Sequence, residues 1–292
     1  MSPAPRRLTW LDVFTGTPMA GNGLAVVHDA DGLEEASMQA FARETRLSET
    51  TFVQSAPDAS TDYINRIWTL AGEMRFAGHP SLGTAVAVAA AAGGGEPARF
   101  VQKTRAGRQP VEVEPAGSGD RLWRASMLQE PADFGERVEA SPLLAAVGLP
   151  PEVAHPALPF QIVSTGTPHV MAPLRTLDAL AAIRPDSVAL RAVLPPRTVL
   201  YLCAVDPDPD AGTARARGVL LDHEGAAFED PATGSAAGPL LAHLHACTGL
   251  EHLVISQGVE MGRPSTLRCA LDGDRVRVGG DVVVLAQGTV WL

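Results

Sequence analysis

A histidine and an aspartate open two similar seven-residue segments of this 292-residue chain. Residues 79–85 (HPSLGTA) and 230–236 (DPATGSA) share the pattern x-P-x-x-G-[S/T]-A, and their starts lie 151 positions apart (230 − 79). Each segment leads into an alanine-rich apolar run. A proline followed by small residues at such a point predicts a loop that opens into a helix, with the proline at the first helical position. We therefore expect two helix starts, with His79 and Asp230 supplying chemistry beside them.

The starts of two such helices suit an anionic ligand. The first N–H groups of a helix have no partner within it and lie at the positive end of the helix dipole. We expect Gly78, Gly83 and Gly234 to offer backbone N–H groups, and Ser235 its hydroxyl, to a carboxylate. The chain has no G-x-x-x-x-G-K-[S/T] pattern and no clear G-x-G-x-x-G after a strand, so a phosphate or dinucleotide cofactor has no support. The prediction is a small carboxylated substrate and no cofactor.

Four side chains have both a chemical and a structural interpretation. Glu49, between a predicted helix and a predicted strand, is either a general acid/base or a solvated surface charge. His79 is either a neutral imidazole at a helix start or a hydrogen-bonded structural histidine. Asp230 is either a functional group or a helix N-cap, which stabilises by about 1 kcal/mol. Asn22 is either a contact to substrate or a turn residue in the left-handed conformation.

The elements that would position these residues alternate between short strands and a few helices. The triplet Gly-Thr-Pro recurs at 16–18 and 166–168, at nearly the same interval as the longer segments. The hydrophobic pattern predicts strands at 8–14, 24–28, from 48, 62–70, 100–103, 110–114, 122–127, 160–164, 199–205 and 214–221, and several strands in the tail from 253, such as 275–278 and 282–285. It predicts helices at 34–45, after 79, at 142–147, within 177–194 and after 236. One alanine-rich helix per half among many short strands predicts an α+β fold, each helix wrapped by a curved antiparallel sheet.

Composition excludes several classes of protein. The formal net charge of −10 argues against a nucleic-acid or anionic-membrane surface. No uninterrupted apolar run of membrane-spanning length occurs, and the start MSPAPRRLTW lacks the apolar core of a signal peptide. Cys203, Cys247 and Cys269 are odd in number and widely spaced, which predicts buried free thiols in a reducing compartment and no structural metal. We expect a cytoplasmic protein.

Six blocks of sequence together resemble the phenazine-biosynthesis PhzF-like family. They occur in the expected order, at 12–15 (DVFT), 21–27 (GNGLAVV), 48–52 (SETTF), 76–80 (FAGHP), 229–236 (EDPATGSA) and 256–265 (SQGVEMGRPS). The resemblance implies a diaminopimelate-epimerase-like fold of two similar domains, with the active site between them. It also implies a homodimer and a cofactor-free isomerase. The implied domains are 1–118 and 119–292, with a C-terminal strand near 284–292 packed on the first domain.

The resemblance also implies roles for individual residues. Glu49 is the family's acid/base, with His79, Asp230 and Ser235 at assisting positions. Related epimerases and racemases use two cysteines where this chain has His79 and Asp230, so a two-thiol racemase is disfavoured. Gly23 stands where the family commonly has proline, and Trp68 and Leu70 also depart from its common pattern. These differences leave the substrate open. The implied reaction is an intramolecular proton shift; the alternative is a metabolite-binding or protein-interaction module without catalysis.

Overall fold

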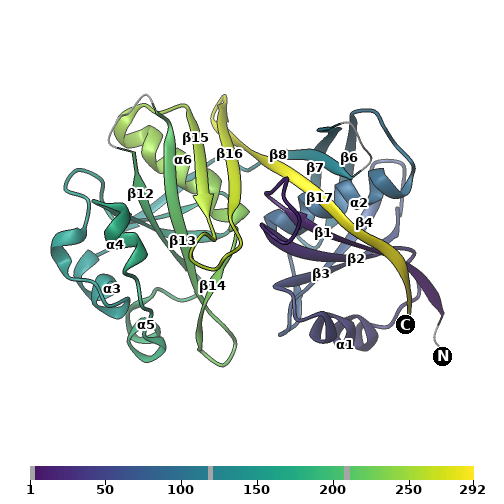
Figure 1. Cartoon of the computed structure of the whole chain (residues 1–292), viewed down its shortest axis with the longest axis horizontal. Coiled ribbons are helices and arrows are strands. Elements are labelled where there is room, and N and C mark those ends of the chain that lie inside the picture. The colour runs from purple at the N-terminus through teal and green to yellow at the C-terminus, as the bar shows by residue number, and fades with distance from the viewer. Residues whose placement is uncertain (1–3, 118–120, 207–210) are drawn as a thin grey trace. The chain divides into compact units, whose positions relative to one another are not determined.

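The computed structural model describes residues 4–117, 121–206 and 211–292. The chain divides into two compact units, Met1–Met127 with Gly279–Leu292, and Leu128–Val278 (Figure 1). The domain boundary predicted between residues 118 and 119 lies outside the described residues. Both units combine helices with β-sheet, so the predicted α+β class is confirmed.

Eight strands of the first unit close into a barrel. Successive pairing joins β1 to β2, β3, β4, β6, β7 and β8, and β17 pairs with both β8 and β1. The unit contains β1 (Pro5–Val13), β2 (Asn22–Val27), α1 (Glu35–Thr45), β3 (Glu49–Ser55), β4 (Tyr63–Trp68), β5 (Glu73–Met74), α2 (Gly78–Ala91), β6 (Ala98–Thr104), β7 (Gly107–Pro115), β8 (Leu122–Leu128) and most of β17 (Arg275–Trp291).

Helix α2 fills this barrel. Its sequence is almost entirely small and apolar, and all of its residues before Val88 are buried, so this part of the helix has no face exposed to solvent. It packs against β1, β2, β3, β4, β6 and β7. Close packing of a helix inside a ring of strands requires small side chains, which explains the alanine-rich run that follows His79. The packing thereby fixes the start of α2, where His79 lies.

The second unit repeats the same order of strand pairings around α6. In the first unit β1–β2 is an antiparallel pair, β2–β3 is parallel, β3–β4 and β4–β5 are antiparallel, β4–β6 is parallel and β6–β7 is antiparallel, with α2 between β5 and β6 in the chain. Strands β10 to β16 pair in the same order and with the same directions, with α6 between β14 and β15. The unit contains β9 (Asp133–Arg137), α3 (Ala140–Ala146), a short 3-10 turn (Pro151–Val153), β10 (Gln161–Ser164), β11 (Pro168–Leu174), α4 (Leu177–Ala181), α5 (Ser187–Val193), β12 (Val199–Val205), β13 (Thr213–Leu221), β14 (Ala227–Asp230), α6 (Gly234–Thr248), β15 (His252–Gln257) and β16 (Ser265–Asp272).

The predicted position of the two prolines is wrong. Helix α2 begins at Gly78, which places Pro80 third in the helix, and α6 begins at Gly234, which leaves Pro231 in the preceding loop. The loop persists past Pro231 because the carbonyl of Pro231 accepts a hydrogen bond from Ser265 Oγ at 2.9 Å and Asp230 is still paired in β14. The two starts are therefore similar in sequence and different in conformation.

The three cysteines differ in their exposure to solvent. Cys203 and Cys269 are buried, and burial raises the pKa of the Cys203 thiol to about 12, whereas Cys247 is exposed and the prediction of three buried thiols is wrong. Cys247 lies in the last turns of α6, whose residues from His245 onward face solvent.

Among the described residues, no helix combines the length and apolar character needed to cross a membrane.

Candidate functional site

Glu49 and His79 lie side by side in the first unit. Glu49 is the first residue of β3, and His79 is the second residue of α2. Glu49 Oε2 is 3.4 Å from His79 Nε2, and the two side chains are only 15% and 6% exposed. Glu49 is therefore not the solvated surface charge that was one interpretation of the sequence. A carboxyl group beside an imidazole in a largely buried environment is an arrangement suited to proton transfer.

The charge and tautomer of His79 follow from its surroundings. Burial lowers the pKa of His79 to about 3, so the ring is neutral near pH 7. Asn22 Nδ2 donates a hydrogen bond to His79 Nδ1 at 3.2 Å. An amide nitrogen only donates, so Nδ1 accepts and the ring hydrogen is on Nε2, which faces Glu49. The neutral imidazole can therefore act as a hydrogen-bond donor next to the carboxyl group.

Asn22 reaches His79 from the first position of β2 and is buried. Asn22 is not among the residues with a positive φ, whereas Gly21, directly before it, has φ 66°, so the left-handed turn interpretation of Asn22 is wrong. A Cβ at Gly21 would come within 2.4 Å of the Val13 carbonyl oxygen, which explains why a glycine precedes Asn22. The tight turn thus delivers the Asn22 amide to the imidazole.

Gly78 and Gly83 occupy different places in α2. Gly78 is the first residue, and its N–H is among those that have no acceptor within the helix. Gly83 is the sixth residue, and a Cβ there would lie 2.6–2.9 Å from side-chain atoms of Leu24, Leu11 and Val13. This close approach accounts for a glycine at position 83 through packing. A contact of Gly83 with substrate stays a prediction.

Asp230 lies in the second unit, at the end of β14. Thr233 Oγ1 donates to Asp230 Oδ2 at 2.8 Å, and Thr233, not Asp230, is the residue that precedes α6. The capping interpretation of Asp230 is therefore wrong.

Gln257 holds the loop between Asp230 and α6. Its Oε1 accepts from Tyr201 Oη at 2.8 Å and from the Thr233 N–H at 3.1 Å, and its Nε2 donates to the Asp230 carbonyl at 2.8 Å. Gln257 is fully buried. The sequence offered it only as part of the block at 256–265, with no sign that its amide would fix the loop. Buried amides with every group paired define one loop conformation.

Gly234 and Ser235 are the first two residues of α6. Ser235 Oγ lies 3.1 Å from Nε2 of His169, a fully buried histidine at the second position of β11. His169 is not among the site residues predicted from the sequence. The available signal was the repeated Gly-Thr-Pro triplet, which is followed by Met19 in one half and by His169 in the other.

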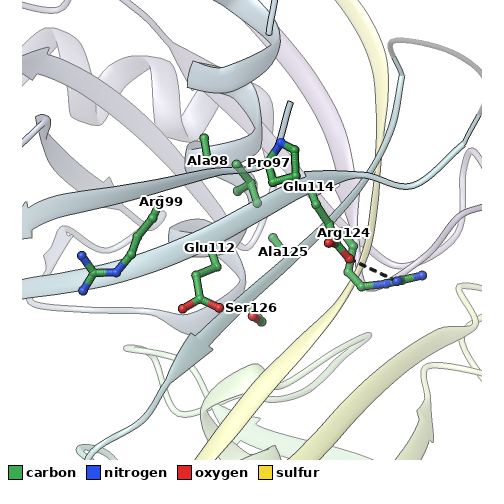
Figure 2. Close-up of a pocket in the computed structure, with 9 residues that line it drawn as sticks. Pro97, Ala98, Arg99, Glu112, Glu114, Arg124, Ala125 and Ser126 are labelled. Atoms are coloured by element: carbon green, nitrogen blue, oxygen red, sulfur yellow. Dashed lines mark hydrogen bonds and ion pairs between the residues drawn. The ribbon is translucent and has the colours of Figure 1, made fainter. Parts of the chain in front are cut away.

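A surface hollow elsewhere on the first unit is not part of this site. Arg99, Glu112, Glu114 and Arg124 line it on β6, β7 and β8, together with Pro97, Ala98, Val113, Ala125 and Ser126 (Figure 2). Arg124 Nη1 is 3.3 Å from Glu114 Oε1. None of the predicted site residues contributes to it. Among the residues that the structure describes, no group of three or more His, Cys, Asp or Glu side chains could hold a metal ion.

The fold and the residues so far define an α+β protein with polar groups gathered at the start of each central helix. The chain belongs to the phenazine biosynthesis-like protein family, whose model matches residues 11–288. It is 36% identical to a trans-2,3-dihydro-3-hydroxyanthranilate isomerase of Pseudomonas fluorescens, over 97% of this chain and 98% of that protein.

Solved structures agree with this membership. The structure of a predicted epimerase from Pseudomonas aeruginosa is 35% identical, covers 98% of this chain and 99% of its own, and superposes with a TM-score of 0.82. A PhzF-family protein of Bacillus anthracis is 25% identical over 99% of this chain and 100% of its own, with a TM-score of 0.86. The family and these relatives make the chain an isomerase.

Proposed function

We propose that this isomerase catalyses a cofactor-independent, intramolecular proton shift on a small carboxylated metabolite, with Glu49 as the acid/base. The observation that supports this most directly is the contact of 3.4 Å between Glu49 and a neutral, buried His79. A proton shift changes no overall oxidation state, so the reaction itself requires no redox group. Positioned acid/base chemistry of this kind typically contributes about 10²- to 10⁴-fold to a rate.

The proposed steps conserve atoms and electrons. Glu49 takes a proton from a substrate carbon, and the electron pair of the broken C–H bond enters the π system of the substrate. Glu49 then returns the proton to another carbon on the same face, which moves the double bond. His79 Nε2–H, oriented by Asn22, donates a hydrogen bond at the reacting face and stabilises the negative charge that develops.

The relative from Pseudomonas fluorescens suggests the substrate class. The compound in its name carries a carboxylate, an amino group and a hydroxyl on a dihydro ring. We propose a substrate of this kind for the present chain, and that compound is the first to assay. The N–H groups of Gly78 and Gly234 remain the candidates for binding the carboxylate, Ser235 for another contact to the substrate, and Asp230 for assisting proton transfer. Gly83 is the sixth residue of α2, beyond the four N–H groups that have no acceptor within a helix, so it is not a candidate donor to the carboxylate. We also propose that the two units arose by duplication of one fold, and that the protein is a cytoplasmic homodimer.

The decisive experiment is Glu49→Gln, assayed in D₂O. The variant keeps the size and a hydrogen-bonding oxygen but cannot take up the proton, so turnover and deuterium incorporation should fall by at least about 10²-fold. Glu44→Gln, at an exposed position of α1, is the matched control and should behave like the wild type. If Glu49→Gln turns over the substrate at the wild-type rate, the assignment is wrong. If the wild type binds the compound without any Glu49-dependent exchange, the chain acts as a binding module.

A further inference from the structure

His169 in the second unit has a fixed tautomer. Its Nδ1 lies 2.7 Å from the carbonyl oxygen of Thr167, and a carbonyl oxygen only accepts hydrogen bonds. The ring hydrogen is therefore on Nδ1. The ring is fully buried, and burial lowers the pKa of His169 to about 4, so it is neutral near pH 7. A neutral ring with its hydrogen on Nδ1 has a lone pair on Nε2.

This lone pair determines what Ser235 can do. Nε2 of His169 is 3.1 Å from Ser235 Oγ, and because Nε2 has no hydrogen the serine hydroxyl is the donor. A serine hydroxyl has one hydrogen and two lone pairs, and here the hydrogen is engaged inside the protein. The oxygen retains lone pairs for another partner. Ser235 itself is only half-buried, in the first turn of α6.

We propose that His169 is a positioning residue that engages the hydroxyl hydrogen of Ser235, so that Ser235 meets the substrate as a hydrogen-bond acceptor. The substrate then carries an N–H or O–H donor at this place, and its carboxylate is bound elsewhere. The inference rests on the proposed function, because it takes Ser235 to contact the substrate. It assigns to Ser235 the opposite polarity from the hydroxyl donor that the sequence suggested.

The tautomer can be measured without a ligand. Long-range ¹H–¹⁵N correlation spectra of the ¹⁵N-labelled full chain near pH 7 should show His169 neutral with its hydrogen on Nδ1. The His169 Nε2 resonance should move in Ser235→Ala, which removes the hydroxyl donor. A hydrogen on Nε2, or a charged ring, would overturn the proposal whatever reaction the protein catalyses.

The polarity of Ser235 can be measured with two probes, benzoate and 2-aminobenzoate, by isothermal titration calorimetry. They share the carboxylate and differ by one neighbouring N–H donor. The wild type should bind 2-aminobenzoate about fivefold more tightly, the range expected for one neutral hydrogen bond, and Ser235→Ala should lose this preference. A wild type that does not distinguish the probes, whether it binds both or neither, contradicts the proposal.

Variants of His169 separate positioning from mere structural support. His169→Phe keeps a ring and removes the acceptor, which frees the hydroxyl to donate to a carboxylate, so the preference should disappear or reverse. His169→Gln offers Oε1 as an acceptor and should restore part of it. His28→Phe is the matched control: His28 is also buried and contacts the Thr9 hydroxyl at 2.9 Å in the first unit, and its loss should leave the preference unchanged. If His169→Phe keeps the fivefold preference, His169 does not orient Ser235.

The two proposals fail in different ways. Full turnover in Glu49→Gln would refute the acid/base assignment and leave the His169 spectra untouched. The wrong His169 tautomer would refute the present inference and leave Glu49-dependent exchange intact.

Discussion

Burial determines the charge state of the histidines, and hydrogen-bond partners determine the tautomer where the ring meets the site. His28, His79 and His169 are each at most 5% exposed, and desolvation lowers their pKa values to about 4, 3 and 4. Partners then place the hydrogen on Nε2 in His79 and on Nδ1 in His169. The Nε2 atoms of the two rings therefore have opposite roles: that of His79 is a hydrogen-bond donor toward Glu49, and that of His169 is an acceptor toward Ser235. A sequence shows only that histidines are present. The position of the ring hydrogen depends on how the folded chain places their partners, the Asn22 amide for His79 and the Thr167 carbonyl for His169.

These buried histidines should make the protein acid-sensitive. In the unfolded chain a histidine gains a proton near its ordinary pKa of about 6.5, whereas the folded His28 stays neutral until about pH 4. Between these values the unfolded chain binds more protons, so the free energy of unfolding falls as the pH is lowered. Removing the group with His28→Asn should make this pH dependence shallower by about 1.4 kcal/mol per pH unit near pH 5.

Urea unfolding between about pH 4.5 and 6.5 measures this slope. All four tryptophans of the chain, Trp10, Trp68, Trp123 and Trp291, belong to the first unit, so their fluorescence reports on the unit that contains His28. The control is His223→Asn, at an exposed position, which should keep the wild-type slope. An unchanged slope in His28→Asn would show that its burial is not maintained in solution.

At the scale of elements, the position of the central helix α2 depends on Gly83, which has no side chain. The atoms nearest to a Cβ at Gly83 belong to Leu24, Leu11 and Val13, all fully buried in β1 and β2. None of these strand side chains can withdraw into open space. The spacing between helix and strands is therefore set at Gly83, four residues after His79. Packing here and catalytic geometry at the helix start depend on the same contact.

Gly83→Ala should consequently destabilise the first unit. Alanine favours a helix over glycine by about 1 kcal/mol, but overpacking a filled core typically costs about 1–3 kcal/mol, so the net change should be a loss. Tryptophan fluorescence during urea unfolding measures it. Gly95→Ala, where a Cβ meets no atom within 4 Å, is the control and should change stability by less than about 0.5 kcal/mol. Equal stability of Gly83→Ala and wild type would mean that the helix can shift.

The elements that the sequence predicted best are those with a strong pattern. The helix at 34–45 is found as α1, and the helical stretch within 177–194 is found as α4 and α5. Short or irregular strands were missed: β5, β9, β11 and β14 have few residues, begin with proline, or lack alternation. Their strand conformation comes from pairing with other strands, β5 with β4, β9 and β11 with β10, and β14 with β13, and not from an alternating pattern of their own. The site shows the same limit of prediction from sequence. Glu49 and His79 could be proposed from motifs, whereas the contacts of Gln257 and His169 exist only once the strands have assembled.

At the scale of the whole molecule, the last strand joins the ends of the chain. β17 pairs antiparallel with β1 along the whole length of β1, from Pro5 opposite Trp291 to Val13 opposite Val282 (Figure 1). It also pairs with β8, which makes it the strand that closes the barrel around α2. The first unit is thus completed only when residues 279–292 have been synthesised, because residues 128–278, which form the second unit, precede them. Sequence alone suggested a returning C-terminal strand through family resemblance, not through any local pattern.

Removing residues 282–292 should therefore unfold the first unit and spare the second. The deletion leaves two strand edges unpaired and exposes the apolar core that Val282, Val283 and Val284 cover. Fluorescence of Trp10, Trp68 and Trp123 should shift to that of solvent-exposed tryptophan, while Tyr201, fully buried in the second unit, should stay protected from solvent. A synthetic peptide of residues 279–292 with Trp291→Phe should restore the native emission when added, and a scrambled peptide should not. If the shortened chain keeps native emission and slow amide exchange in α2, the barrel does not depend on β17, and the start of the helix that presents His79 is held by the other seven strands.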